Sequence, residues 1–567
     1  MELPIDKDAK DELVKKNVPM NGDAKKNTLF DKLGKLFSGK PKKAVNLKFE
    51  LHNVAVPELE SYSIVSQYEV GDSKVYIAKD QAGKMHYLVS EPPIGDKGKA
   101  VYSKIMNYLF VSLSYELPEN EPDVRGFVRK KIIEISKELG LLSTTIKILD
   151  KLQYYVIRDS FGYGIIDVLM KDKNIEDIVE ESFDKPVGVA HKEYGEYGIL
   201  DTNIKFNSFE LANSFVQKLV QRTGKSMTAA VPYIDTMTKD GSRIAATFGK
   251  EVSLPGPNFT IRKFSEEPYT ITRLIELGTL NTLLAAYVWL LLEAKAFVLV
   301  IGSTAAGKTT TIGALSSLIN PQMKITTIED TPEIKIGHMH WQRLITRKSS
   351  GISEDKYEVT MDDLIKLSLR SRPDYIIVGE VRGKEISSLI QAVSTGHGGL
   401  TSFHAFDAAS AFVRMESPPM NVHVGGQMLI SALLHQKRIV DPDGKTSRRI
   451  TEITEVVPKQ NSISLNKVME WDASSSQFVP TDIDEVISRS VRLKEIGIMN
   501  GWSHDEIASQ LVTRMCFLSR MVNSGVRRFN DVTSELAKFY YDPVEKYMTV
   551  LNSSSLSDVE RIRTRRA

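Results

Sequence analysis

The sequence predicts an α/β protein in which a buried parallel sheet is flanked by helices. The first observation is the apolar run FVLVI at 297–301, which leads directly into the segment GSTAAGKT and then into a helical stretch. The second observation is a pair of later β-branched runs, KITTI at 324–328 and YIIV at 375–378, each followed by acidic residues. Strands that alternate with helices in this way are typical of parallel sheets.

The segment at 302–309 matches the pattern GxxxxGKT between a predicted strand and a predicted helix at 308–318, which is the context of a phosphate-binding loop. Backbone N–H groups of such a loop surround phosphate oxygens, and the positive end of the helix faces the same charge. Lys308 is expected to reach the β- and γ-phosphates, and the Thr309 hydroxyl to bind Mg²⁺. We therefore expect ATP and Mg²⁺ as ligands, held by Gly302, Ser303, Thr304, Ala305, Ala306, Gly307, Lys308, Thr309 and Thr310.

Carboxylates follow both of the later strands. The first strand leads to Glu329, Asp330 and Glu333 in EDTPE, and the second leads to Glu380 in GEVRG. Because ligands of open α/β sheets bind at the carboxyl ends of the strands, these side chains are expected to face the same crevice as the loop. One carboxylate can hold Mg²⁺, directly or through water, while another orients the attacking water. The sequence thus predicts ATP hydrolysis as well as binding.

Two histidines lie seven residues apart in STGHGGLTSFHA at 394–405. His397 lies beside glycines that allow the backbone to approach a phosphate closely, and His404 follows the β-capable segment at 400–403. A neutral imidazole can sense a γ-phosphate or hold a glutamate by a hydrogen bond. A metal site is not expected here, because no cysteine is near and no third ligand is evident.

These four segments, in this order, resemble the motor ATPases of type II secretion, type IV pilus and archaellum systems, and they fit the archaeal branch best. The resemblance covers roughly 166–435. It implies a RecA-like P-loop motor domain in which 302–309 is the Walker A loop, 328–333 the aspartate box, 376–382 the Walker B segment and 394–405 the histidine box.

The same resemblance assigns roles to single residues. It makes Glu333 the water-activating carboxylate and Glu380, with Thr309, the group associated with Mg²⁺. His397 and His404 become phosphate-linked sensors. Glu329 stays open as an alternative for the base.

Family members also complete the site with arginines from the preceding domain. The segment at 231–249 resembles that pattern, with a turn at 240–241 followed by Arg243, our first choice. An arginine fork suits bidentate contact with phosphate better than lysine does. Further candidates are Arg222, Arg262, Arg343 and Arg347.

The chain departs from the family pattern without losing a chemical group that the mechanism uses. Ala305 and Ala306 replace the more common glycine or serine, and Thr331 stands where many bacterial members have proline. A four-cysteine zinc module, frequent in bacterial assembly motors, is absent because the chain has a single cysteine, Cys516.

Four regions are predicted along the 567 residues. Residues 1–45 form a basic tail, with lysines and apolar residues interleaved over Lys25–Lys43 as in a short amphipathic helix. Residues 46–157 form an accessory domain with strands at 62–87 and helices at 97–157. Residues 158–264 form a small α/β domain, PAS-like and sensor-like by the resemblance, and 265–567 form the motor domain with a helical C-terminal extension.

Composition limits the remaining function classes. The net charge of +2 argues against a dedicated nucleic-acid binder, so no nucleic acid is expected. The longest apolar run, Leu283–Leu292, is half a membrane span and is expected to be a core helix, and no secretory signal peptide is expected. The basic tail could contact an anionic membrane surface or a membrane protein, or be a solvated linker.

Three functions follow, in order of preference. The first is a homo-hexameric motor, cytoplasmic and peripheral at the inner face of the membrane, that moves a polytopic membrane platform protein. The second is a nucleic-acid translocase or a conjugation-type ATPase on the same core. The third is a nucleotide-responsive scaffold with little turnover, which would require a missing catalytic group.

Overall fold

The computed structural model describes residues 49–54, 57–113, 123–264, 267–347, 358–440 and 446–541. The chain divides into two compact units, one made of Met1–His52 and Pro93–Phe161 and the other of Asn53–Pro92 and Gly162–Ala567. The basic segment predicted at 25–43 lies outside the described residues.

The first unit is helical where it is described, as the three- and four-residue spacing of its apolar side chains predicts. Ile105, Ile132 and Leu152 are fully buried at its centre. Asp123 caps one helix by accepting a hydrogen bond from the Gly126 amide. The helices are α2 (Asp96–Leu113), α3 (Val124–Glu138), α4 (Leu142–Lys147) and α5 (Leu149–Ser160).

The second unit contains two sheets, and the first has nine strands in the order β1-β2-β3-β6-β5-β4-β9-β8-β7. Strands β1–β3 form an antiparallel meander, and β3 pairs in parallel with β6. The strands at 62–87 are therefore part of this sheet rather than of the helical unit. The elements are η2 (Leu59–Ser61), β1 (Ser63–Val70), β2 (Ser73–Lys79), β3 (Met85–Ser90), η3 (Gly164–Ile166), α6 (Asp167–Lys171), β4 (Ile175–Glu180), β5 (Pro186–His191), η4 (Gly195–Tyr197), β6 (Ile199–Lys205), α7 (Phe209–Gln221), β7 (Tyr233–Met237), β8 (Arg243–Thr247) and β9 (Phe259–Arg262).

The second sheet also has nine strands, in the order β12-β11-β13-β14-β10-β15-β16-β17-β18. The neighbouring strands β12, β11, β13, β14, β10 and β15 are parallel to one another. Strands β16, β17 and β18 extend the sheet from β15 in antiparallel pairs. The strand before the glycine-rich loop, β10, is central, and β14 lies between it and β13. The strands are β10 (Phe297–Ile301), β11 (Ile325–Glu329), β12 (Trp341–Ile345), β13 (Tyr375–Val381), β14 (Gly398–Phe403), β15 (Ala432–Val440), β16 (Thr446–Lys459), β17 (Ser462–Asp472) and β18 (Gln477–Val479).

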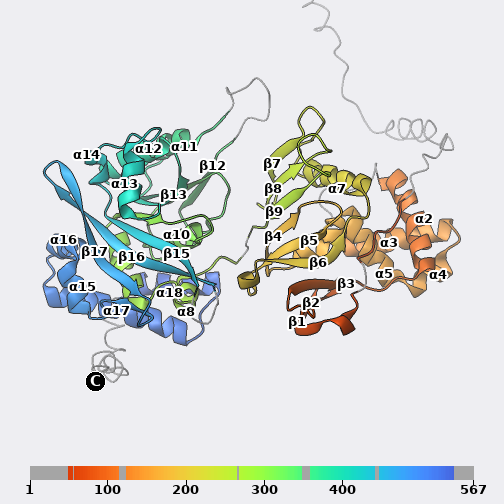
Figure 1. Ribbon diagram of the computed structural model, residues 1–567, viewed down its shortest axis with the longest axis horizontal. Coiled ribbons are helices and arrows are strands. Elements are labelled where there is room, and N and C mark those ends of the chain that lie inside the picture. The colour runs from red at the N-terminus through yellow and green to blue at the C-terminus, as the bar shows by residue number, and fades with distance from the viewer. Residues whose placement is uncertain are drawn as a thin grey trace, which may run out of the picture. The chain divides into compact units, whose positions relative to one another are not determined.

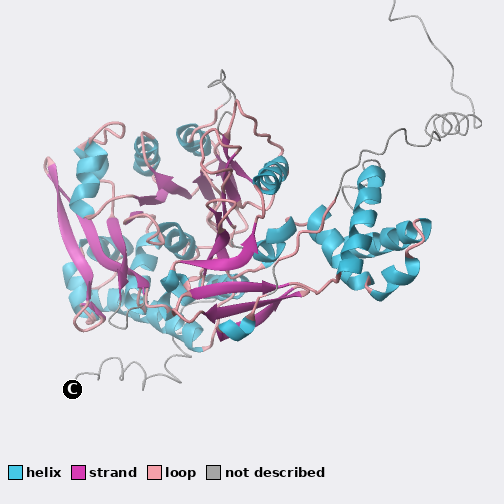
Figure 2. Ribbon diagram, turned by 45° about the vertical axis from the view of Figure 1, so that its right-hand side comes forward, coloured by secondary structure: helices cyan, strands magenta, loops and turns pink. Residues whose placement is uncertain are grey.

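Helices cover both faces of this sheet: Figure 1 shows α11, α12 and α14 near the top and α8, α17 and α18 at the bottom, and Figure 2 shows helices around the strands of this sheet. Each face buries its own apolar cluster. The helices are α8 (Ile271–Glu276), α9 (Thr282–Glu293), α10 (Lys308–Ser316), α11 (Met361–Leu369), α12 (Glu385–Ser394), α13 (Ala408–Glu416), α14 (Val424–Gln427), α15 (Ile483–Arg489), α16 (Val491–Asn500), α17 (His504–Asn523) and α18 (Phe529–Tyr541).

Helix α9 is the apolar run that precedes β10. It begins where the Asn281 side chain accepts a bond from the Leu284 amide, and every residue of 283–292 is buried. The prediction of a core helix is therefore confirmed. Within the described ranges, no helix combines the length and apolarity that a membrane span needs. The predicted α/β fold, in which a largely parallel sheet that carries the glycine-rich loop follows a second α/β sheet, is also confirmed.

Candidate functional site

The glycine-rich loop connects the fully buried strand β10 to helix α10. Gly302 has a φ of +153°, and a Cβ there would lie 2.1 Å from the Gln436 carbonyl oxygen on β15. Gly307, at the cap of α10, has a φ of +92°, in the left-handed region that glycine accepts without strain. Arg448 of β16 donates from Nε to the Ala305 carbonyl oxygen at 3.2 Å. The loop is thus shaped by β10 and by packing against β15 and β16.

Lys308 turns back over this loop. Its Nζ donates to the Ser303 carbonyl oxygen at 2.9 Å and to His404 Nδ1 at 3.2 Å, and the residue is 7% exposed. Burial lowers the pKa of Lys308, and the charge of Glu380 opposes this shift. A buried ammonium group beside backbone N–H groups is suited to a phosphate.

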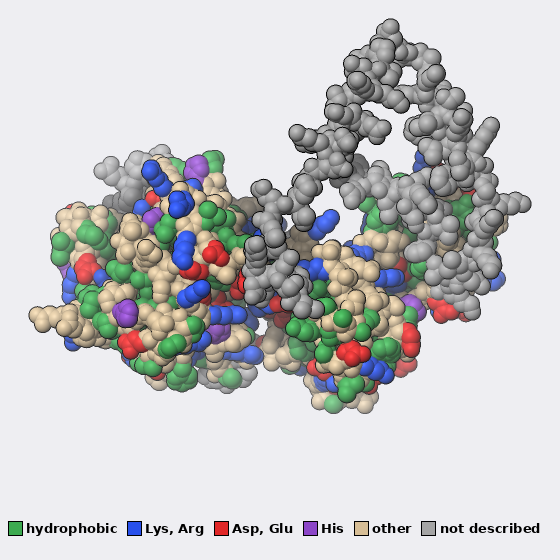
Figure 3. All heavy atoms as spheres, turned by 90° about the horizontal axis from the view of Figure 1, so that it is seen from above, with side chains coloured by type: hydrophobic (Ala, Val, Ile, Leu, Met, Phe, Trp, Pro, Cys, Tyr) green, Lys and Arg blue, Asp and Glu red, His purple; other side chains and the backbone are tan. Residues whose placement is uncertain are grey.

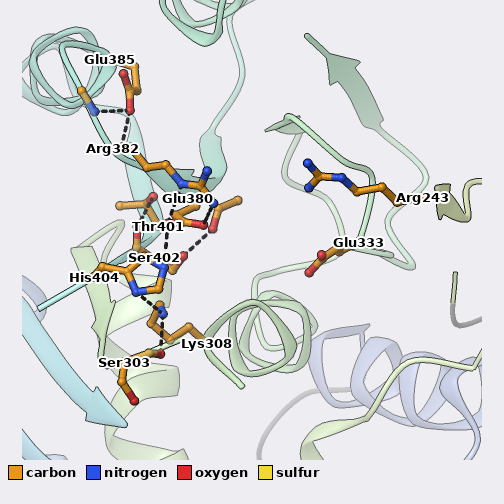
Figure 4. A network of polar contacts seen from close by, with 12 residues as sticks. Arg243, Ser303, Lys308, Glu333, Glu380, Arg382, Glu385, Thr401, Ser402 and His404 are labelled. Carbon is orange, nitrogen blue, oxygen red and sulfur yellow. Dashed lines mark hydrogen bonds and ion pairs between the residues drawn. The ribbon is translucent and has the colours of Figure 1, made fainter. Parts of the chain in front are cut away.

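His404 connects Lys308 to Glu380, as Figure 4 shows. Because an ammonium group only donates and a carboxylate only accepts, Nδ1 accepts from Lys308 and Nε2–H donates to Glu380 Oε1 at 2.9 Å. Burial and the Lys308 charge lower the pKa of His404, which favours this neutral tautomer. The imidazole therefore fixes the positions of the lysine and the carboxylate relative to each other.

Glu380 lies near the end of β13 and is also bound by Arg382. Arg382 donates from Nε to Oε1 and from Nη2 to Oε2, both at 2.8 Å. Burial alone would raise the pKa of Glu380, but the Arg382 bonds and charge, together with the Lys308 charge, outweigh it and lower the pKa. Glu380 is therefore a carboxylate held by cations at the edge of the loop.

The two glutamates of the EDTPE segment have different environments. Glu329 ends β11 and is 2% exposed, and its Oε1 accepts from the backbone amides of Glu333 and Ile334, both at 2.8 Å. Burial raises the pKa of Glu329 to about 7, although these two bonds and Arg343 oppose the shift. The Glu333 side chain is 35% exposed and faces the cavity described next. The geometry makes Glu329 a support for the turn that carries Glu333.

A cavity of about 440 Å³ is lined by the carboxylate residues Glu329, Glu333 and Glu380. Its lining includes Thr309 at the start of α10, Glu333 and Glu380, and Arg243 from the preceding sheet. Arg243 is paired bidentately with Asp235 on the neighbouring strand β7. Arg262, its register partner on β9, places Nη1 3.8 Å from Glu333 Oε1. The cavity therefore combines a hydroxyl, carboxylates and guanidinium groups.

Some predicted residues lie away from this cavity. His397 precedes β14 and places Nδ1 2.9 Å from the Ala392 carbonyl oxygen. Since Phe297 pairs with Gly399 and Ile301 with Phe403, His397 lies at the end of the strands opposite the loop and away from His404, and its phosphate contact stays a prediction.

The remaining arginine candidates differ in their surroundings. Arg222 donates to the Gly162 carbonyl oxygen and stacks 4.8 Å from the Tyr163 ring centre, away from the cavity. Arg343 lies 3.9 Å from Glu329 Oε2, and Arg347 lines the cavity.

Arg382 and Arg448 were missed as site residues. A signal for Arg382 was present, because it directly follows β13 and stands two residues after Glu380, close enough in sequence for its guanidinium group to reach that carboxylate. No comparable signal marked Arg448, which reaches the loop from a strand distant in sequence.

Comparisons with known proteins place the chain among related sequences. A family model described as "Type II/IV secretion system protein" matches residues 202–469. An uncharacterised protein of Methanocaldococcus jannaschii is 32% identical over 526 residues, which is 88% of this chain and 92% of that protein. A Mycobacterium tuberculosis protein whose name refers to conjugal transfer is 28% identical over 326 residues, 55% of this chain and 89% of that protein.

A solved structure, that of the ATPase DotB of Legionella pneumophila, is 17% identical with a TM-score of 0.36, covering 64% of this chain and 91% of that one. The archaeal match spans nearly the whole chain, so the similarity extends well beyond the loop motif.

Proposed function

Because the chain belongs to the type II/IV secretion system ATPase family, we propose that it hydrolyses ATP as a homo-hexameric motor at the inner face of the cytoplasmic membrane. The motor drives a polytopic platform protein that assembles a pilus-like filament, an archaellum or a secretion apparatus. The observation that supports hydrolysis most directly is the linked set of Lys308, His404 and Glu380 beside the cavity that Thr309 and Glu333 line.

The residues present fit a magnesium-bound nucleoside triphosphate. Gly307 has a left-handed φ, the Lys308 ammonium group is buried, and the hydroxyl-bearing Thr309 lines the cavity. The backbone of 302–307 and Lys308 would hold the phosphates, and Thr309 and Glu380 would hold the metal, which supplies positive charge to the transferring phosphoryl group.

Glu333 is the proposed base for the attacking water, and Glu329 is its positioning residue. A base must face the space where water and phosphate meet, and Glu333 lines the cavity with its side chain partly exposed. Glu329 is instead buried and bonded to the backbone of its own turn. Holding that turn fixes where the Glu333 carboxylate lies.

Arg243 and Arg262 supply charge to the triphosphate from the preceding sheet. Both belong to neighbouring strands, β8 and β9, and are partly exposed. Guanidinium groups at this position can stabilise negative charge that develops on phosphate oxygens. Rigid movement of the sheet relative to the motor domain would couple their contact to the nucleotide cycle.

A nucleic-acid translocase is the second candidate, favoured by the relative named for conjugal transfer. On the face shown in Figure 3, Lys and Arg side chains of the described residues stand among acidic and apolar ones, whereas a nucleic-acid track would be expected to form a basic stripe. The membrane motor is therefore preferred.

The test is steady-state ATP hydrolysis by the full chain with and without vesicles of anionic lipid, and with and without single-stranded DNA. Lys308→Ala and Glu333→Gln should abolish turnover, whereas Lys366→Ala on the exposed side of α11 should not. Stimulation by lipid supports the membrane motor. Stimulation by DNA alone would support the translocase, and wild-type protein that binds ATP without turnover would support the scaffold.

A further inference from the structure

Arg382 and Glu380 form an ion pair whose two members differ in exposure. The Glu380 side chain is 21% exposed and projects from β13, which is paired on both sides within the sheet. The Arg382 side chain is 65% exposed. Of the two, the arginine is the member that can swing away without disturbing a strand.

The Glu380 carboxylate is largely occupied by hydrogen-bond donors. Arg382 supplies two bonds at 2.8 Å and His404 Nε2 a third at 2.9 Å, so Oε1 accepts two donors and Oε2 one. Mg²⁺ requires carboxylate oxygens or its own waters in near-ideal octahedral geometry. A divalent cation and Arg382 therefore compete for the same oxygens.

The Arg382 guanidinium group also has a second position to occupy, at the cavity. It lines the same cavity of about 440 Å³ as Thr309, the residue expected to lie beside the metal and the terminal phosphates. The positive charges of Lys308 and Arg243 act on it electrostatically, as does the negative charge of Asp330. A guanidinium fork in this setting is suited to a phosphate with two free oxygens.

We propose that Arg382 is a latch that holds Glu380 and exchanges it for the terminal phosphate of a bound nucleoside triphosphate, which makes the carboxylate available to the metal. No covalent bond changes in this exchange. The inference rests on the proposed function for its ligand. In this arrangement a diphosphate, which lacks the terminal group, leaves Arg382 on Glu380, so the latch reports whether the third phosphate is present.

The first test uses no nucleotide. Mn²⁺ binding to the full chain is measured by electron paramagnetic resonance for wild type, Arg382→Gln, Arg382→Lys and, as a matched control, the exposed Arg370→Gln at the end of α11. Arg382→Gln removes the competing cation and should tighten Mn²⁺ binding by about tenfold, within the usual range of coupled ligands. Adding Glu380→Gln to Arg382→Gln should remove the gain, and the control should match wild type.

The second test compares fluorescent ATP and ADP analogues by titration with Mg²⁺ present. Arg382→Gln should weaken ATP more than ADP, by about fivefold or more, and Arg382→Lys should keep part of the preference. A merely structural role would weaken both nucleotides equally.

Unchanged or weaker Mn²⁺ binding by Arg382→Gln, or equal losses for ATP and ADP, would overturn the latch. Thermal unfolding checks each variant, and if Arg382→Gln does not fold, Arg382→Lys decides, because it keeps the charge and loses the fork. Wild-type protein that binds no nucleotide would refute the proposed function, whereas the Mn²⁺ measurement would still decide whether Arg382 competes with a cation for Glu380.

Discussion

Replacing Glu329 separates the two glutamates of the EDTPE segment, because a positioning residue and a base respond differently to the same change. Glu329→Ala removes the acceptor of two backbone amides, those of Glu333 and Ile334. Each buried amide left without a partner costs about 1–3 kcal/mol. The turn should shift to recover these bonds, and a displacement of about 1 Å at the base can lower the rate about 100-fold.

Glu329→Gln keeps an oxygen where Oε1 accepts these bonds. Its NH₂ group takes the place of Oε2, which accepts no hydrogen bond in the described structure and lies 3.9 Å from Arg343 Nε. The two weaker bonds should lower the rate only about fivefold, because the turn keeps its acceptor, while the NH₂ group buried beside Arg343 should lower the free energy of unfolding by about 1–3 kcal/mol. The expected order of kcat for ATP hydrolysis is therefore wild type, then Glu329→Gln, then Glu329→Ala, with Glu333→Gln lowest.

The assay pairs kcat with hydrogen exchange at the Ile334 amide, which should be protected in Glu329→Gln and exposed in Glu329→Ala. If Glu329→Gln were as inactive as Glu333→Gln while the Ile334 amide stayed protected, the turn would be intact and Glu329 itself would be the base. That result would refute the assignment.

Three further predictions follow from single contacts. Burial and the Asp184 charge raise the pKa of Glu180 from 4.5 to about 7. The free energy of unfolding therefore falls by about 3 kcal/mol as pH rises between these values, because the buried carboxyl group must ionise. Glu180→Gln should then unfold at a higher temperature than wild type at about pH 8 and at the same temperature at about pH 4; a pH-independent difference would contradict this. His404→Ala removes bonds to two charged groups and should lower kcat by about tenfold to 100-fold, whereas an unchanged kcat would mean that the imidazole is dispensable. Arg243→Ala should lower kcat by at least about tenfold, while the kcat of Arg222→Ala should stay within about twofold of wild type. Equal losses would mean that Arg222 also acts on the triphosphate.

Local patterns in the sequence predicted the centre of the fold. The β-branched runs at 297–301, 324–328 and 375–378 correspond to β10, β11 and β13, and the helix begins at Lys308 as the glycine-lysine signal indicates. These features depend on neighbours in the chain. The pairing of β3 with β6 depends on residues more distant in the sequence, and no periodicity encodes it.

The same distinction between local and long-range interactions explains which site residues could be predicted. Lys308 and Thr309 belong to one contiguous motif, whereas the bond from Arg382 to Glu380 and the inward orientation of Glu329 depend on tertiary packing. The position of His397 could have been anticipated, because a strand extends about 3.3 Å per residue and β14 separates it from His404 by six residues. Two histidines so spaced cannot both reach one phosphate.

The contact between Gly302 and Gln436 makes the loop a shared property of two segments. Backbone of β15 occupies the space that any side chain at position 302 would need, so the path of the loop depends on where that strand lies. A substitution that shifts Gln436 should therefore change the conformation of the loop, although the two segments are distant in sequence. Likewise, the GSTAAGKT segment could be placed between a strand and a helix of another protein with its sequence unchanged. It would keep its conformation only if β15 were transferred with it.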